Sequence, residues 1–149
     1  MSLPLGHWHD SFRVFMQVVI AYFLTAIIGW DREREEHIAG IRTFPIVGVA
    51  SCGFLLIVAG SKDPAAPSRL MQGLIAGIGF VGGGAILKEG PTVKGTATAA
   101  SIWNAGVIGV AVAMQHYDIA IILSLLNLFS LRVLLPLKTW LDRDRESKP

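Results

Sequence analysis

Long apolar runs without charge alternate with short charged clusters along the chain, and this pattern predicts membrane-spanning helices. Each run is about 17 to 23 residues long, which suits a helix that crosses the hydrocarbon core of a bilayer. We expect five spans, at residues 14–30, 43–61, 70–87, 96–117 and 119–137. Residues 1–13 then form an N-terminal segment, and residues 138–149 form a charged cytoplasmic tail that we expect to be disordered from Asp142 onward.

Composition supports a membrane protein over a soluble domain. Of the 149 residues, 52% are hydrophobic and only 16% are charged, against about 25% charged in an average soluble domain. We therefore expect an all-α fold, a polytopic bundle of transmembrane helices with the lipid bilayer as its main partner. We expect neither a nucleic-acid nor a nucleotide partner.

The distribution of Lys and Arg predicts the orientation, because basic residues accumulate on the cytoplasmic side. With the N-terminus outside, three basic residues fall in outside segments and nine in inside segments, namely Arg32, Arg34, Arg42, Lys88, Lys94, Lys138, Arg143, Arg145 and Lys148. We thus predict the N-terminus out and the C-terminus in. Arg132, within the fifth span, is expected to extend its side chain toward the inner surface.

The third span, residues 70–87, is rich in glycine, which suits close helix packing in a membrane or a functional break in the helix. A re-entrant third segment is the alternative. Gly77 to Gly82 match the letters of the dinucleotide fingerprint G-x-G-x-x-G, but no strand precedes them, so a nucleotide site is not expected. We expect these glycines to pack against the fourth span or to present backbone carbonyls.

The fourth span opens with small and hydroxylated residues that can lie against the glycines of the third. Thr96 or Thr98 can cap its N-terminus, and Trp103 is expected to face the bundle interior. For the amide side chains inside spans we expect hydrogen bonds between helices; these are Gln17, Gln72, Asn104 and Asn127.

Two inside segments, residues 30–42 and the basic hairpin 88–95, bring carboxylates and cations together. One interpretation is a Mg²⁺ site, for which Asp31, Glu33 and Glu89 are weak candidate ligands. The favoured interpretation is a solvated helical extension held by ion pairs at i,i+3 and i,i+4 spacing. An ionic lock between the two segments is intermediate between these.

The motifs together resemble the MgtC/SapB family of bacterial membrane proteins over residues 14–135. They are Gly29–Glu33, Ala39–Thr43, Gln72 with Gly77–Gly84, Lys94–Trp103 and Ala105–Gly109. The resemblance implies a five-span, multi-pass protein of the bacterial inner membrane, associated with growth in low magnesium, stress and virulence. Longer family members carry a cytoplasmic C-terminal domain that resembles ACT domains, whereas this sequence stops about ten residues past its last span.

We select as candidate site residues those where a physical oddity and a family motif coincide, together with Lys94. The inner polar cluster comprises Asp31, Arg32, Glu33, Arg42, Thr43 and Lys94. The helix-packing or backbone-path positions are Gly77, Gly79, Gly82, Gly84, Gly95, Thr98 and Trp103.

The resemblance implies a non-enzymatic regulator or adaptor of other membrane proteins, such as ATPases, and the alternative is a Mg²⁺ transporter or channel subunit. No Asp or Glu lies inside any expected span, which weakens transport of a dication. The spans also hold no paired general acid and base, so we expect no enzyme. We expect no cofactor other than a possible Mg²⁺, and a partner that is a second copy (a homodimer) or another membrane protein.

Overall fold

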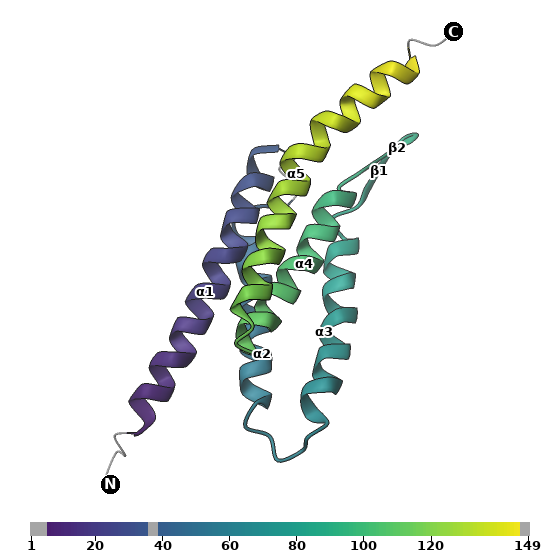
Figure 1. The fold of residues 1–149 in the computed structure, drawn as a ribbon. Helices are drawn as coiled ribbons and strands as arrows, with labels where there is room; N and C mark the ends of the chain where they lie inside the picture. Colours follow the sequence, from purple (N-terminus) through teal and green to yellow (C-terminus); the bar gives the residue numbers. More distant parts are fainter. Residues whose placement is uncertain (1–5, 36–38, 147–149) are drawn as a thin grey trace.

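The computed structural model describes residues 6–35 and 39–146, which form a bundle of five helices with one β-hairpin (Figure 1). The elements are α1 (Gly6–Glu35), α2 (Thr43–Val58), α3 (Ala66–Gly83), β1 (Leu87–Glu89), β2 (Thr92–Lys94), α4 (Thr96–Ala113) and α5 (Tyr117–Glu146). The expected all-α helical bundle is confirmed, and the hairpin lies where the basic segment 88–95 was expected.

The outer helices extend beyond the expected spans at both ends of the chain. Helix α1 already begins at Gly6, within the segment expected to precede the first span. Helix α5 continues to Glu146, so the expectation of disorder from Asp142 is wrong as far as that residue. Charged residues end a membrane span because lipid excludes them, but they do not end a helix that continues into water. Residues 1–5, 36–38 and 147–149 lie outside the described part.

Three helices are long and apolar enough to cross a membrane, by length and composition, among the described residues. They are the 25-residue stretch Asp10–Arg34 of α1, the whole of α4, and Tyr117–Leu134 of α5. Helix α2 is apolar but has only 16 residues. Helix α3 is not among the three, since glycines and the polar residues of its first turns lower its hydropathy. The number of spans and their orientation stay predictions.

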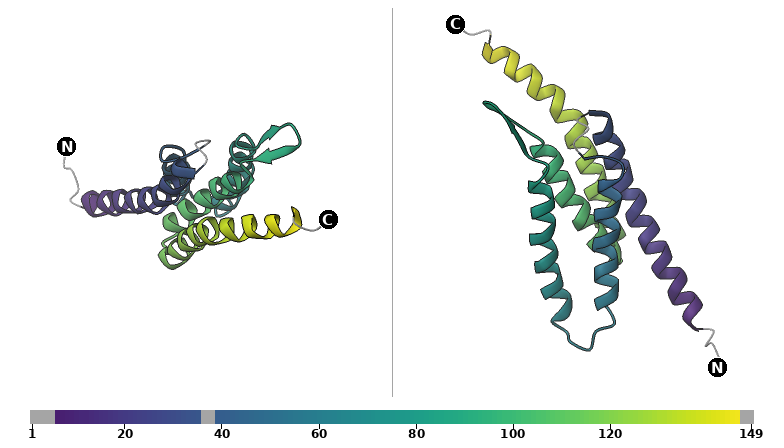
Figure 2. Two further views of the ribbon diagram at one scale, coloured as in Figure 1. Left: turned by 90° about the horizontal axis from the view of Figure 1, so that it is seen from above. Right: turned by 180° about the vertical axis from the view of Figure 1, so that it is seen from behind.

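Successive helices run in alternating directions, as Figure 1 shows and Figure 2 confirms from behind. The C-terminal ends of α1 and α5 lie at the same end of the bundle as the hairpin, and the connection between α2 and α3 lies at the other end. The two charged segments expected to share one side of the membrane are therefore at one end of the molecule, for the residues that are described.

Helix α4 forms the centre of the bundle, because it packs against all four other helices. Ten of its 18 residues are buried, whereas in α3 only Gly82 is buried. Helices α2 and α4 approach each other closely, since a Cβ added at Gly109 would clash with the carbonyl oxygen of Gly48. The glycines that bring two helix backbones together are therefore mainly those of α2 and α4.

Candidate functional site

Asp31, near the end of α1, joins the first helix to the last. Its Oδ1 atom accepts a hydrogen bond of 2.7 Å from Nε of Arg132 on α5, and its Oδ2 atom lies 3.4 Å from Nη2 of Arg32. The Arg32 side chain is 3% exposed and that of Asp31 is 9% exposed, whereas Arg132 is largely exposed. Arg132 therefore fixes α5 to α1, a role beyond the expected extension toward the inner surface.

Glu33 organises the turn from α1 to α2. Its Oε2 atom accepts a 3.2 Å hydrogen bond from the backbone N–H of Ile41, and its side chain occupies the space where a Cβ at residue 40 would lie. Helix α2 then starts at Thr43, with exposed Arg42 at its N-cap. The motif residues of this turn are thus close in space, although Glu33 contacts the backbone and Asp31 contacts the guanidinium groups.

Lys94 was expected to join the inner polar cluster around Asp31, but it pairs within the hairpin instead. Its Nζ atom lies 2.7 Å from Oε2 of Glu89, and both side chains are well exposed. The hydrogen bond that Lys94 donates to the Glu89 carboxylate raises the pKa of Lys94 above its usual value.

The three candidate magnesium ligands have separate partners. Asp31 contacts two guanidinium groups, and Glu89 pairs with Lys94. Glu33 accepts a hydrogen bond from the backbone N–H of Ile41. In the described part of the chain, no three His, Cys, Asp or Glu residues lie close enough together to hold a metal ion. The arrangement in the described residues fits an ionic connection between helices better than a cation site.

Only some of the glycines expected to pack α3 against α4 do so. A Cβ at Gly82 would lie 3.0 Å from the carbonyl oxygen of Ala99 in α4, and Gly84 is at the C-cap of α3. Gly77 and Gly79 have no neighbour within 4 Å of a Cβ added to either residue, so they do not pack against α4 within this chain. The alternative, that they present backbone carbonyls, stays a prediction. The side of α3 that faces α4 carries Gly82 and Ile78, because a Cβ added at Gly106 of α4 would meet the Ile78 side chain.

The structure contradicts two expectations for the first turns of α4, those for the N-cap and for Trp103. The N-cap is Gly95, in the left-handed region with φ 81°, so neither Thr96 nor Thr98 occupies the N-cap position that had been expected for one of them. Thr98 is completely buried. Trp103 is 43% exposed and so does not face the bundle interior as expected, because α4 is buried on the sides that carry its small residues.

Three of the four amide side chains form the expected hydrogen bonds between helices, among the residues that the structure describes. Gln17 of α1 donates to the carbonyl oxygen of Val112 at 3.1 Å. Ser101 of α4 donates to Oδ1 of Asn127 in α5 at 2.8 Å, and Asn104 donates to a backbone carbonyl of α5 at 3.2 Å. Gln72, in contrast, is exposed on α3.

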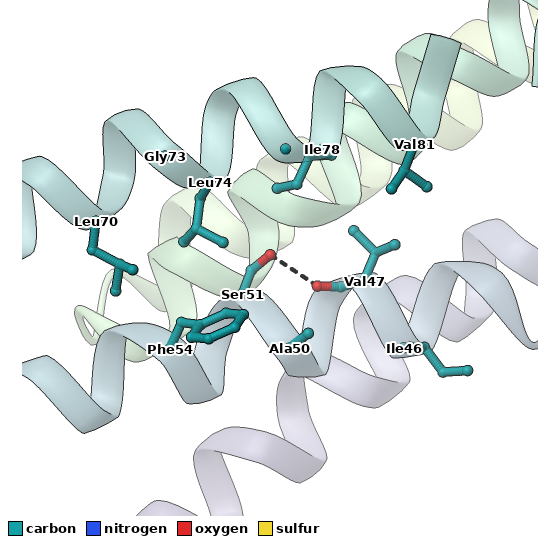
Figure 3. Close-up of a pocket in the computed structure, with 11 residues that line it drawn as sticks. Ile46, Val47, Ala50, Ser51, Phe54, Leu70, Gly73, Leu74, Ile78 and Val81 are labelled. Carbon is teal, nitrogen blue, oxygen red and sulfur yellow. Dashed lines mark hydrogen bonds between the residues drawn. The ribbon is translucent and has the colours of Figure 1, made fainter. Parts of the chain in front are cut away.

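An apolar groove lies between α2 and α3, and sequence reasoning did not find it (Figure 3). Its volume is about 390 Å³, and its walls include Phe54 of α2 and Leu74 of α3, with Gly73 and Gly77 along one side. The hydroxyl group of Ser51 points into the groove but donates within α2, to the carbonyl oxygen of residue 47 at 2.8 Å. The groove therefore offers shape and apolar surface, and little hydrogen bonding.

A second cavity, of about 640 Å³, lies between α4 and α5 and has a mixed lining. Leucines of α5 form its apolar wall, while Arg32, Lys94 and the first residues of α4 supply polar groups. The cavity thus combines two residues of the expected inner polar cluster that are far apart in sequence.

Comparison with known proteins gives one family. Residues 18–140 match the MgtC family. The chain is 33% identical to protein MgtC of Salmonella typhimurium over 110 residues, 74% of this chain and 47% of that protein. It is 31% identical to protein SrpB of Synechococcus elongatus over 144 residues, 87% of this chain and 77% of SrpB.

An uncharacterised protein of Synechocystis is 30% identical over 135 residues, 91% of this chain and 56% of that protein. The chain therefore spans about half the length of the Synechocystis protein and of Salmonella MgtC. No solved structure matches the chain.

Proposed function

The chain belongs to the MgtC family of membrane proteins, and from this premise we propose that it is a non-enzymatic regulator of another membrane protein. In this proposal it binds a transmembrane helix of its partner in the groove between α2 and α3. The observation that carries the proposal is this apolar groove, beside which Gly82 is the single residue of α3 that its own chain buries.

The groove has the chemistry of a site for a helix. Its lining includes Gly73 and Gly77, one turn apart and with no neighbour within 4 Å of an added Cβ. Small residues at this spacing let a second helix backbone approach closely, which is the main source of helix association in lipid. Bulky residues such as Phe54 and Leu70 then provide pockets between the partner's side chains.

The partner class follows from the family resemblance and from the location of the groove within the apolar helices. We propose a membrane ATPase of the bacterial inner membrane, contacted through one of its transmembrane helices during adaptation to low magnesium or stress. A second copy of this chain is the competing occupant, and a homodimer formed through the same groove is an outcome that the experiment below must separate.

Transport of Mg²⁺ is supported less well by the geometry. A path for a dication needs carboxylate or carbonyl oxygens free to replace water. Asp31, the most buried carboxylate among the described residues, instead pairs with Arg32 and Arg132. Asp31 would therefore have to leave both guanidinium groups before it could bind a cation.

The test compares two leucine substitutions on one helix. Gly77→Leu fills the groove, whereas Gly79→Leu adds the same side chain outside the groove lining, also without a clash in this chain. We expect the wild type and Gly79→Leu to change the rate of ATP hydrolysis by purified ATP synthase when both proteins share the same proteoliposomes. With Gly77→Leu, this change in rate should be at least tenfold smaller.

Two controls complete this experiment. Light scattering in detergent reports whether Gly77→Leu converts a dimer to a monomer, which would identify a second copy as the occupant. Mg²⁺ uptake into vesicles that contain only this chain should not exceed that of empty vesicles. Uptake above empty vesicles, or equal loss of the regulatory effect in both variants, would contradict the proposal.

A further inference from the structure

The cavity between α4 and α5 is lined by hydrogen-bond donors at one end and by apolar side chains along its length. At the donor end lie Arg32, whose side chain is 3% exposed, and Lys94 of the hairpin. Ser101 and Asn127 continue the lining, and leucines of α5 such as Leu126 form the remaining wall. The described residues that line this cavity include no carboxylate.

The start of α4 adds positive potential to the same end. Gly95, Thr96 and Ala97 line the cavity, and Gly95 at the N-cap has no side chain to accept from the first N–H groups of the helix. In an 18-residue helix these N–H groups and the helix dipole favour an anion. This feature coincides with two cationic side chains from other elements, so the site does not depend on the helix end alone.

One polar atom in the lining lacks a partner. The Nδ2 atom of Asn127 is buried and has no hydrogen-bond partner among the described residues, although its Oδ1 atom is held by Ser101. Leaving a buried donor unsatisfied costs about 1–3 kcal/mol. An acceptor that enters the cavity would remove this cost after a small rotation of the amide.

The charges around the cavity favour an anion over a cation. Three cations, Arg32, Arg132 and Lys94, face two carboxylates, Asp31 and Glu89. Glu89 is well exposed and pairs with Lys94 on the water side, so the pair is weak and Lys94 can turn to an anion.

We propose that this cavity binds an anionic phospholipid of the bilayer, with the headgroup phosphate beside Arg32, Lys94 and the N-terminus of α4. The acyl chain then lies along the leucines of α5. The position suits the ligand, because the cavity begins at the bundle end that carries the hairpin and reaches Asn104, nine residues and about 13 Å along α4. Basic pockets between transmembrane helices commonly bind anionic headgroups in this manner. The site uses a different pair of helices from the groove, so it stands or falls separately from the proposed function.

The test is native mass spectrometry of the full chain in detergent, with phosphatidylglycerol or phosphatidylcholine of identical acyl chains. We expect phosphatidylglycerol to be retained preferentially. Lys94→Gln should weaken this binding about fivefold. Lys88→Gln removes the same charge from the same hairpin at an exposed residue outside the cavity lining, and should leave binding within about twofold.

A third variant tests the cavity without changing charge. Ala97→Phe fills the donor end and should abolish the preference for phosphatidylglycerol, with circular dichroism confirming that all three variants are folded. Equal retention of both lipids, or equal weakening by the two lysine variants, would overturn the proposal. So would binding of millimolar inorganic phosphate that displaces the lipid, because the ligand would then be the free anion.

Discussion

At the scale of single residues, the ion pair between Asp31 and Arg132 is a contact that local sequence signals could not predict. The two residues are 101 positions apart, and Asp31 sits in a run of charges that equally suits pairing along one helix. Its nearest sequence partner, Arg32, does contribute, at 3.4 Å. Sequence reasoning therefore selected Asp31 but missed Arg132, which lies closer to its carboxylate than Arg32 does.

Asp31→Asn should destabilise the bundle by about 3 kcal/mol, the lower end of the range for breaking a buried ion pair, since Arg132 is exposed. The reason is that the buried guanidinium of Arg32 loses a carboxylate and α5 loses its connection to α1. Thermal unfolding in detergent measures the effect. Arg132→Gln, which leaves Asp31 with Arg32, should cost less, and an unchanged melting temperature for Asp31→Asn would exclude this role.

At the scale of helices, the sequence predicts which segments are helical but not which faces meet. Charged clusters mark the ends of apolar runs, so the five helices and the hairpin were expected in the observed order, although α1 and α5 are longer than expected. Glycines, however, occur throughout α2, α3 and α4, and a glycine-rich run does not reveal its packed side. The close α2–α4 approach at Gly48 and Gly109 was therefore missed, while Gly77 and Gly79 were assigned a contact within the chain that they do not make.

Gly109→Ala should destabilise the protein by about 1–3 kcal/mol, because its methyl group would clash with backbone atoms of α2, which cannot rotate away. The matched control is Gly53→Ala in α2, where an added Cβ meets no atom within 4 Å. That control should be neutral or up to about 1 kcal/mol more stable, since alanine favours a helix. Equal melting temperatures for the two variants would show that the α2–α4 approach is looser than described.

At the scale of the whole molecule, the alternating helices separate two ends of the bundle. One end carries the hairpin and most of the cations, and the other carries the connection between α2 and α3. Helices α1 and α5 each have 30 residues, about 45 Å in length against about 30 Å for the hydrocarbon core. Each helix is therefore longer than the hydrocarbon core is thick, which the uncharged runs alone did not indicate. The two cavities likewise arise only from the packing of helix pairs, so no pattern in the sequence marked them.

The orientation can be tested by labelling single cysteines in a Cys52→Ser background with a maleimide that does not cross membranes. The label is added to cells whose outer membrane has been made permeable and whose inner membrane is intact. Lys62→Cys, in the connection between α2 and α3, should be labelled from outside. Thr92→Cys, in the hairpin, should be labelled only after the inner membrane is opened. Labelling of both residues from the same side would contradict the up-and-down arrangement across the membrane.

The pairing of Asp31 with Arg132 has a consequence for how the protein is synthesised. At 5–20 residues per second, the ribosome needs roughly 5–20 s to advance the 101 positions from Asp31 to Arg132. During that delay the nascent first helix holds a carboxylate whose final partner does not yet exist. A transcript truncated before codon 132 would leave this carboxylate without its α5 partner, a state that quality-control proteases of the membrane could recognise.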